Sequence, residues 1–117
     1  MSIGTPEVVS KNFKETIKEY ESGHFLASAF ITSRVIRYIL DKIEGETDDE
    51  KIRSLISRGV IQKNRKDIHT SIIKASRRSR NYLSHDIGIF PDSSDSLSLL
   101  GDSISLLKYY ISYVKIG

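Results

Sequence analysis

Residues 24–43 read HFLASAFITSRVIRYILDKI, with apolar side chains that recur at steps of three and four residues. That period is typical of an amphipathic α-helix. The apolar face is wide, and it consists of Leu26, Phe30, Ile31, Val35, Ile36, Ile39, Leu40 and Ile43. Gly45 follows as a C-terminal stop signal. The stretch therefore predicts the central helix of a helical core.

Helix signals lie on both sides of this stretch. Before it, Thr5-Pro6-Glu7 has the order of a hydroxyl cap, a proline at the first helical position and an acid in the first turn. This first helix is expected to continue to Gly23, with inward Val9, Phe13, Ile17 and Tyr20. After the central stretch, Thr47-Asp48-Asp49-Glu50 has the spacing of a capping box, so a short helix should begin there and end near Gly59.

The last two patterns are longer. One helix is predicted from about Gln62 to Ser84, with inward Ile68, Ile72, Ala75, Ser79 and Leu83. Gly88, Pro91 and the polar run at 92–95 then indicate a loop, in which Asp92 or Ser94 caps the next helix. That helix has the spacing of a coiled-coil seam, formed by Leu97, Leu100, Ile104, Leu107, Ile111 and Val114. The stripe is either the buried face of a bundle helix or a face for self-association.

These patterns predict one all-α domain over residues 1–117, folded as an up-and-down bundle of four or five helices. A chain of this length buries about two-thirds of its unfolded surface, which is enough for one core. The sequence has no cysteine, so disulfides and thiolate metal ligands are excluded. It shows neither a secretory signal nor a run of about 18 apolar residues, and we expect a soluble cytoplasmic protein with no membrane segment.

The net charge of +3 favours no class of partner, but the charges are unevenly placed. Seven lysines and arginines fall within residues 63–80, opposed there only by Asp67, and an acidic cluster at 44–50 precedes them. Both runs are either solvated helix faces that suit the helix dipole or, for the basic run, a surface for polyanionic phosphate. On the second interpretation Lys74, Arg77 and Arg78 bind the backbone of RNA.

The basic run ends in Arg80-Asn81-Tyr82-Leu83-Ser84-His85, where the helical pattern breaks. A guanidinium binds phosphate, and an imidazole moves protons near neutral pH. Residues five apart are separated by about 140° around an ideal helix. Arg80 and His85 therefore converge only if the helix unwinds near Leu83, or if each faces a copy from a second subunit. Otherwise His85 is a surface histidine at the negative end of a helix dipole.

Other kinds of catalytic site have little support. His24 and His69 have no comparable neighbours, and we interpret them as structural or solvated. No histidine pair has metal-ligand spacing, and neither a nucleotide-binding glycine loop nor a nucleophile elbow is present, so no metal or cofactor is expected.

The remaining groups suit cleavage of RNA. His85 would take the proton from a ribose 2′-hydroxyl, which attacks its own phosphate, while Arg80 stabilises charge on the phosphoryl oxygens. The products would be a cyclic phosphate and a free 5′-hydroxyl. DNA lacks the 2′-hydroxyl and should survive.

In these features the chain resembles the HEPN superfamily, small helical-bundle proteins. Their mark is an arginine, often followed by asparagine or another polar residue, and a histidine a few residues later, at the end of the long helix before the last one. Arg80, Asn81 and His85 stand at these places, and the helix order fits over nearly the whole chain. The resemblance implies a metal-independent endoribonuclease that works as a homodimer, with a site formed between two subunits. Asn81 would orient the catalytic groups or the phosphate.

The resemblance also implies biological settings. Many HEPN proteins act as toxins, in defence or in RNA processing, and some are paired with a nucleotidyltransferase-type antitoxin. In the paired toxins a tyrosine two residues after the histidine can receive a nucleotide, and this chain departs from that pattern with Ile87. Other members are non-catalytic modules that bind a nucleotide or a partner protein, which is the alternative function for this chain.

Overall fold

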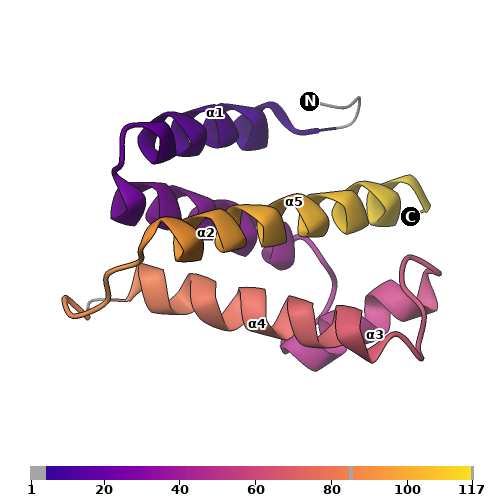
Figure 1. Ribbon diagram of the computed structural model, residues 1–117. Coiled ribbons are helices and arrows are strands. Elements are labelled where there is room, and N and C mark those ends of the chain that lie inside the picture. The colour runs from indigo at the N-terminus through magenta and orange to yellow at the C-terminus, as the bar shows by residue number, and fades with distance from the viewer. Residues whose placement is uncertain (1–4, 85, 117) are drawn as a thin grey trace.

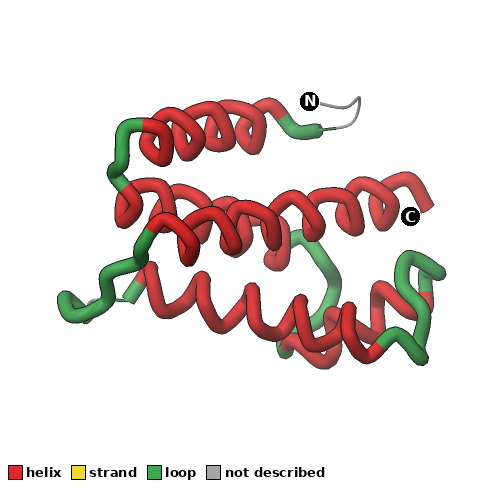
Figure 2. Tube along the Cα trace, viewed as in Figure 1, coloured by secondary structure: helices red, strands yellow, loops and turns green. Residues whose placement is uncertain are grey.

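The computed structural model describes residues 5–84 and 86–116, and this part of the chain contains five helices and no strand. The helices are α1 (Glu7–Glu21), α2 (Phe25–Asp41), α3 (Asp48–Ser57), α4 (Lys66–Leu83) and α5 (Ser93–Ile116). Loops connect these helices, and a short loop precedes α1 (Figure 2). The prediction of an all-α fold is confirmed.

The helix α2 is the central element, because it packs against α1, α4 and α5. The four long helices lie alongside one another, and those that follow one another in the chain run in opposite directions (Figure 1). The short α3 sits at one end of the bundle and packs against α4. No helix among the described residues combines the length and apolar character that crossing a membrane requires.

The core confirms only the second half of the apolar face predicted for residues 24–43. Its buried members are Val35, Ile36, Ile39, Leu40 and Ile43, which join Phe13, Leu55, Ile72, Leu99 and Leu106 from the other helices. Leu26 and Phe30 are each 45% exposed, against expectation. Both side chains lie in the first turns of α2 and outside the buried core cluster.

The stripe predicted for the last helix is only partly buried, because Leu107 is buried and Leu100 and Ile111 are partly buried against the core. Leu97, Ile104 and Val114, three members of the expected stripe, are exposed. The other buried residues of α5 each stand one position before a member of the predicted stripe, and they are Ser96, Leu99, Ser103, Leu106 and Tyr113. Small serines let two helices approach closely, and a pattern that counts only apolar residues does not register them. A similar shift affects α1, where Thr16 is buried and Ile17 is exposed.

Buried hydroxyl groups join α1 to α2. The hydroxyl of Thr16 donates to the carbonyl of Ser28 at 2.7 Å and lies 2.7 Å from the hydroxyl of Thr32. The hydroxyl of Ser28 in turn donates to the carbonyl of Thr16 at 3.0 Å. All three side chains are fully buried, so these hydrogen bonds satisfy polar groups that water cannot reach.

The capping box predicted at the start of α3 is confirmed. The amide of Glu50 donates to the hydroxyl of Thr47 at 3.2 Å, and the Glu50 carboxylate accepts from the amides of Glu46 and Thr47. These amide donors, that of Glu46 foremost, lower the pKa of Glu50. Asp92 caps α5, since its carboxylate accepts from the amide of Asp95 at 2.8 Å. At α1 the N-cap is Pro6 rather than Thr5.

A buried lysine closes the C-terminal end of α2. The ammonium of Lys51 donates to the carbonyl of Leu40 at 2.7 Å and to that of Ile43 at 3.0 Å, and the residue is only 6% exposed. The chain reaches this position through Gly45, whose φ of 129° excludes most side chains. A Cβ atom at Gly45 would also lie 2.8 Å from the backbone nitrogen of Lys51. The sharp turn at Gly45 thus brings α3 back under the end of α2.

Candidate functional site

The break in α4 occurs where the sequence predicts it. The helix ends at Leu83, and Ser84 has extended backbone with a ψ of 169°. The hydroxyl of Ser84 donates to the carbonyl of Asn81 at 2.7 Å, which closes the last turn. His85, the predicted catalytic base, lies outside the described residues. The described part of the site is therefore the last turn of α4 and its surroundings.

Arg80 in that turn is paired with Asp48 in the first turn of α3. Its guanidinium donates to both carboxylate oxygens, at 3.3 Å to Oδ1 and at 3.4 and 3.5 Å to Oδ2. The Arg80 side chain is 55% exposed, whereas that of Asp48 is 18% exposed. The carboxylate thus holds one side of the guanidinium and leaves much of the group open to solvent.

Asp48 is itself held by a hydrogen-bond chain that crosses three helices. The hydroxyl of the fully buried Ser76 on α4 donates to Asp48 Oδ1 at 2.9 Å. Arg37 on α2 donates to the same hydroxyl at 2.9 Å. This chain, Arg37–Ser76–Asp48–Arg80, fixes the carboxylate before any substrate is present, and a fixed carboxylate limits the orientations that the Arg80 guanidinium adopts.

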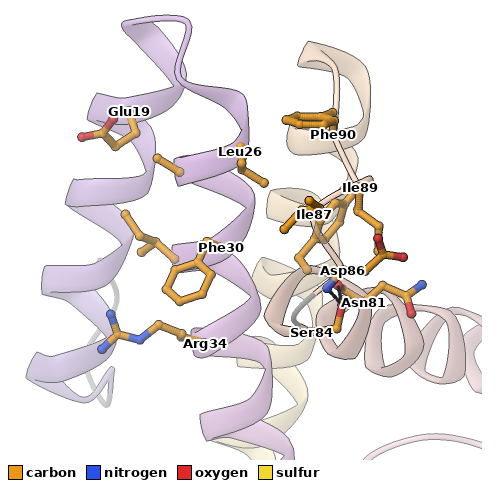
Figure 3. A pocket seen from close by; sticks show the side chains of 13 residues that line it. Glu19, Leu26, Phe30, Arg34, Asn81, Ser84, Asp86, Ile87, Ile89 and Phe90 are labelled. Atoms are coloured by element: carbon orange, nitrogen blue, oxygen red, sulfur yellow. Dashed lines mark hydrogen bonds between the residues drawn. The ribbon is translucent and has the colours of Figure 1, made fainter.

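Asn81 and Arg80 contribute to different surfaces. Asn81 lines a cleft of about 850 Å³ between the first half of α2 and the segment around residues 84–90, whereas Arg80 is directed to α3. The close-up shows Asn81 and Ser84 at the edge of this cleft where α4 ends (Figure 3). The sequence-predicted pair Arg80 and Asn81 is therefore neighbouring in the chain but split between two faces of α4.

The cleft walls are mostly apolar. Leu26 and Phe30 form the wall on α2, and Ile87 and Phe90 approach from the other side (Figure 3). Tyr82 also lines the cleft, and burial raises the pKa of its hydroxyl. The sequence placed Leu26 and Phe30 in the core, so the cleft is a feature that the helical pattern did not reveal.

The three predicted RNA-binding residues lie on the exposed side of α4. Lys74 and Arg77 are exposed, and so is Arg78. Arg78 already donates to the hydroxyl of Ser98 at 3.1 Å and lies 3.6 Å from a carboxylate oxygen of Asp102. Burial raises the pKa of Asp102, while Arg78 and Lys74 act in the opposite direction. Asp102 thus partly neutralises the charge of Arg78, whereas Arg77 is exposed to solvent.

The other two histidines make local contacts. His24 Nδ1 lies 2.8 Å from a carboxylate oxygen of Glu19, at the turn between α1 and α2. His69 Nε2 lies 3.1 Å from the carbonyl of Gln62, just before α4. Both contacts suit the structural role expected from the sequence. Within the described residues, no group of three or more His, Asp or Glu side chains is placed to hold a metal ion.

Comparison of the chain with protein-family models, with curated proteins and with solved structures gives no match. The site must therefore be interpreted from its own chemistry. A half-exposed guanidinium, oriented by a shielded carboxylate at a helix end, is suited to bind an anion such as a phosphate. Asp48 is the residue of this site that the sequence did not single out, because its contact with Arg80 joins positions 32 apart in the chain.

Proposed function

We propose that this protein is a metal-independent endoribonuclease of the HEPN type that acts in the cytoplasm, as a toxin, in defence or in RNA processing. The proposal depends above all on Arg80. The guanidinium of this half-exposed side chain is fixed by Asp48 in the last turn of α4, and His85 stands two residues after that end in the sequence. A phosphate-binding group and a proton-transfer group thus occupy the same helix terminus in the chain.

In the proposed reaction His85 removes the proton of a ribose 2′-hydroxyl, and the 2′-oxygen attacks the adjacent phosphorus. Arg80 stabilises the negative charge that develops on the phosphoryl oxygens. The bond to the 5′-oxygen of the next nucleotide breaks, and that oxygen takes up a proton to leave as a 5′-hydroxyl. The other product carries a 2′,3′-cyclic phosphate.

The proposed site is shared between two copies of the chain. Arg80 reaches toward α3 while Asn81 faces the cleft on the α2 side, so the motif of one copy does not gather on one surface of α4. A second copy would supply the missing groups, with Asn81 orienting the phosphate or the catalytic side chains. Lys74, Arg77 and Arg78 would bind the RNA backbone beyond the site.

The test is cleavage of single-stranded RNA in EDTA by the purified chain. We expect Arg80→Ala and His85→Ala each to abolish cutting, and single-stranded DNA of the same sequence to remain intact. Matched controls are Arg53→Ala, which removes an exposed arginine of α3, and His69→Ala, which removes a histidine at the opposite end of α4 from the site. Cleavage that survives in both site variants, or that is lost equally in the controls, would contradict the proposal.

One observation favours the alternative of a non-catalytic module that binds a nucleotide or a partner protein. The Arg80 guanidinium already has a carboxylate partner, which is what a purely structural arginine requires. On this alternative the wild-type chain does not cut RNA at any concentration, and Arg80→Ala lowers only the stability of the contact between α3 and α4. The same assay therefore separates the two functions.

A further inference from the structure

Exposed apolar side chains gather around the cleft beside the end of α4. Leu26 and Phe30 are each 45% exposed, Phe90 is 74% exposed and Ile87 is 91% exposed. All four line the same cleft, although they come from two segments about 60 residues apart in the chain. A contiguous apolar surface of this kind marks a place where another molecule binds, because scattered exposed apolar residues do not concentrate in one hollow.

The charged groups at this surface have both signs. Arg34, at one side of Phe30, has no hydrogen-bond or ion-pair partner among the residues that the structure describes. Asp86, at the other side, is exposed, and its carboxylate accepts only from the nearby amide of Gly88 within that same set of residues. Figure 3 shows the two side chains on opposite sides of the cleft. The remaining acid, Glu19, contacts His24.

These charges decide between two occupants. A polyanion such as RNA would meet the carboxylates of Glu19 and Asp86 and a mainly aliphatic wall, which suits it poorly. A surface that meets a copy of itself across a two-fold axis must instead be self-complementary, with a positive group on one side and a negative group on the other. Arg34 and Asp86 satisfy that condition.

We propose that residues 26–34 of α2 and the segment around residues 86–90 form the surface through which two copies of this chain associate about a two-fold axis. Phe30 and Ile87 lie near the centre of this contact, and the guanidinium of Arg34 faces Asp86 of the partner subunit. Asn81 and Ser84 line the same cleft, so this contact brings these two residues of both copies to one interface, while Arg80 of each copy stays beside its own α3. The identity of the partner as a second copy rests on the proposed function, which needs a shared site.

The test uses charge reversal at two exposed positions, Arg34→Glu and Asp86→Arg, followed by sedimentation. We expect the wild-type chain to be a dimer. In either variant alone, like charges face each other twice across the axis, and dimer affinity should fall roughly tenfold or more. In an equal mixture of the two variants, opposite charges face each other again across the contact. The mixture should therefore form a heterodimer with an affinity close to that of the wild-type dimer. Helical circular dichroism verifies that each variant is folded.

Three outcomes would overturn the assignment. One is a wild-type chain that is monomeric at all concentrations. The second is a wild-type dimer that neither variant weakens but that Ile104→Asp dissociates, since this would place the contact on the exposed face of α5. The third is that Phe30→Ala loses RNA binding while its sedimentation mass stays that of the wild-type oligomer, which would make the cleft a site for a nucleobase.

Measurement of RNA cleavage on the same samples separates this assignment from the proposed function. A mixture that recovers the dimer but cuts no RNA supports the contact surface and removes the nuclease. A monomer that cuts RNA removes the contact surface and retains a nuclease whose site lies within one copy.

Discussion

Arg80 in the last turn of α4 and Asp48 in the first turn of α3 are joined at 3.3 Å, so the phosphate-binding group of the proposed site is aimed by a residue of another helix. The carboxylate is the more shielded of the two, and Ser76 fixes it from behind. In the proposed site Asp48 is a positioning residue, because it would act on RNA only through its contact with Arg80.

The first prediction concerns Asp48. Arg80→Ala should lower kcat for RNA cleavage by about 100-fold or more, the usual loss when a group that stabilises transition-state charge is removed. Asp48→Asn should lower kcat by roughly tenfold and leave KM unchanged, because the guanidinium remains but loses its fixed orientation. Single-turnover kinetics provide the measurement, and Asp49→Asn, which alters the neighbouring exposed acid, is the control. Faster cleavage by Asp48→Asn would mean that Asp48 restrains Arg80 instead of positioning it.

The second prediction concerns the basic face of α4. Each phosphate contact contributes about 0.7 to the slope of log affinity against log salt for a single strand. Arg77→Gln should therefore reduce the slope by about that amount. Arg78→Gln should reduce it less, because Arg78 already pairs with Asp102. Fluorescence anisotropy with labelled RNA at several salt concentrations measures both, and Lys14→Gln on the exposed side of α1 serves as control. If neither Arg77→Gln nor Arg78→Gln alters the slope, the basic run is a solvated face.

The third prediction concerns Lys51. Its ammonium donates one hydrogen bond to the carbonyl of Leu40 near the end of α2 and one to the carbonyl of Ile43 just after that helix, and the residue is buried. Lys51→Met keeps the aliphatic stem but leaves both carbonyls without that donor, so the free energy of unfolding should fall by about 2–3 kcal/mol. Urea titration followed by circular dichroism measures the change. Lys14→Met, at an exposed helical position, should be nearly neutral, and an equal loss in both variants would refute the role given to Lys51.

The fourth prediction concerns the hydroxyl cluster between α1 and α2. Thr16→Val retains the shape of the side chain but removes the group that contacts Ser28 and Thr32. Two buried hydroxyls and one carbonyl then lose a partner, and we expect unfolding free energy to drop by about 1–3 kcal/mol. Thr70→Val, at an exposed position of α4, is the matched control in the same thermal or urea experiment. If Thr16→Val were as stable as wild type, the cluster would not hold the two helices.

The fifth prediction concerns acid stability. The hydrogen bond from Arg65 lowers the pKa of Asp67 to about 2 from its ordinary 3.8. A carboxyl group whose folded pKa is depressed stabilises the fold above its unfolded pKa, and this contribution is lost as the pH falls through the folded value. The urea midpoint of wild type should therefore decline between about pH 4 and 2, and Asp67→Asn and Arg65→Gln should both show a smaller decline. Titration of Asp67 near its ordinary pKa by NMR would contradict this.

The sequence predicted the helices well because their start and stop signals are local. The capping box at Thr47 and the break after Leu83 each depend on a few adjacent residues, and both are observed, whereas α2 ends at Asp41, earlier than the stop signal at Gly45 predicted. The choice of buried face depends on what lies opposite. Leu26 and Phe30 carry the same apolar chemistry as the core residues of α2, yet they line the open cleft instead of the core.

The sequence predicted which residues of α4 belong to the candidate site but not how they are arranged in space. Arg80 and Asn81 could be identified from their order before the helix break, but their division between two sides of α4 follows from the rotation of each residue about the helix axis. Asp48 stands in a run of acids that all look alike in sequence. Only the path of the connection through Gly45 selects it as the partner of Arg80.

The hydrogen-bond chain from Arg37 to Arg80 has a consequence for how such a protein can change over time. Three helices together hold one guanidinium, so substitutions at Arg37 on α2 or at Ser76 on α4, neither of which lines the cleft, change its orientation without altering a group that would meet a substrate. Arg37 and Ser76 are thus two positions outside the cleft at which laboratory evolution of this protein would adjust the orientation of Arg80.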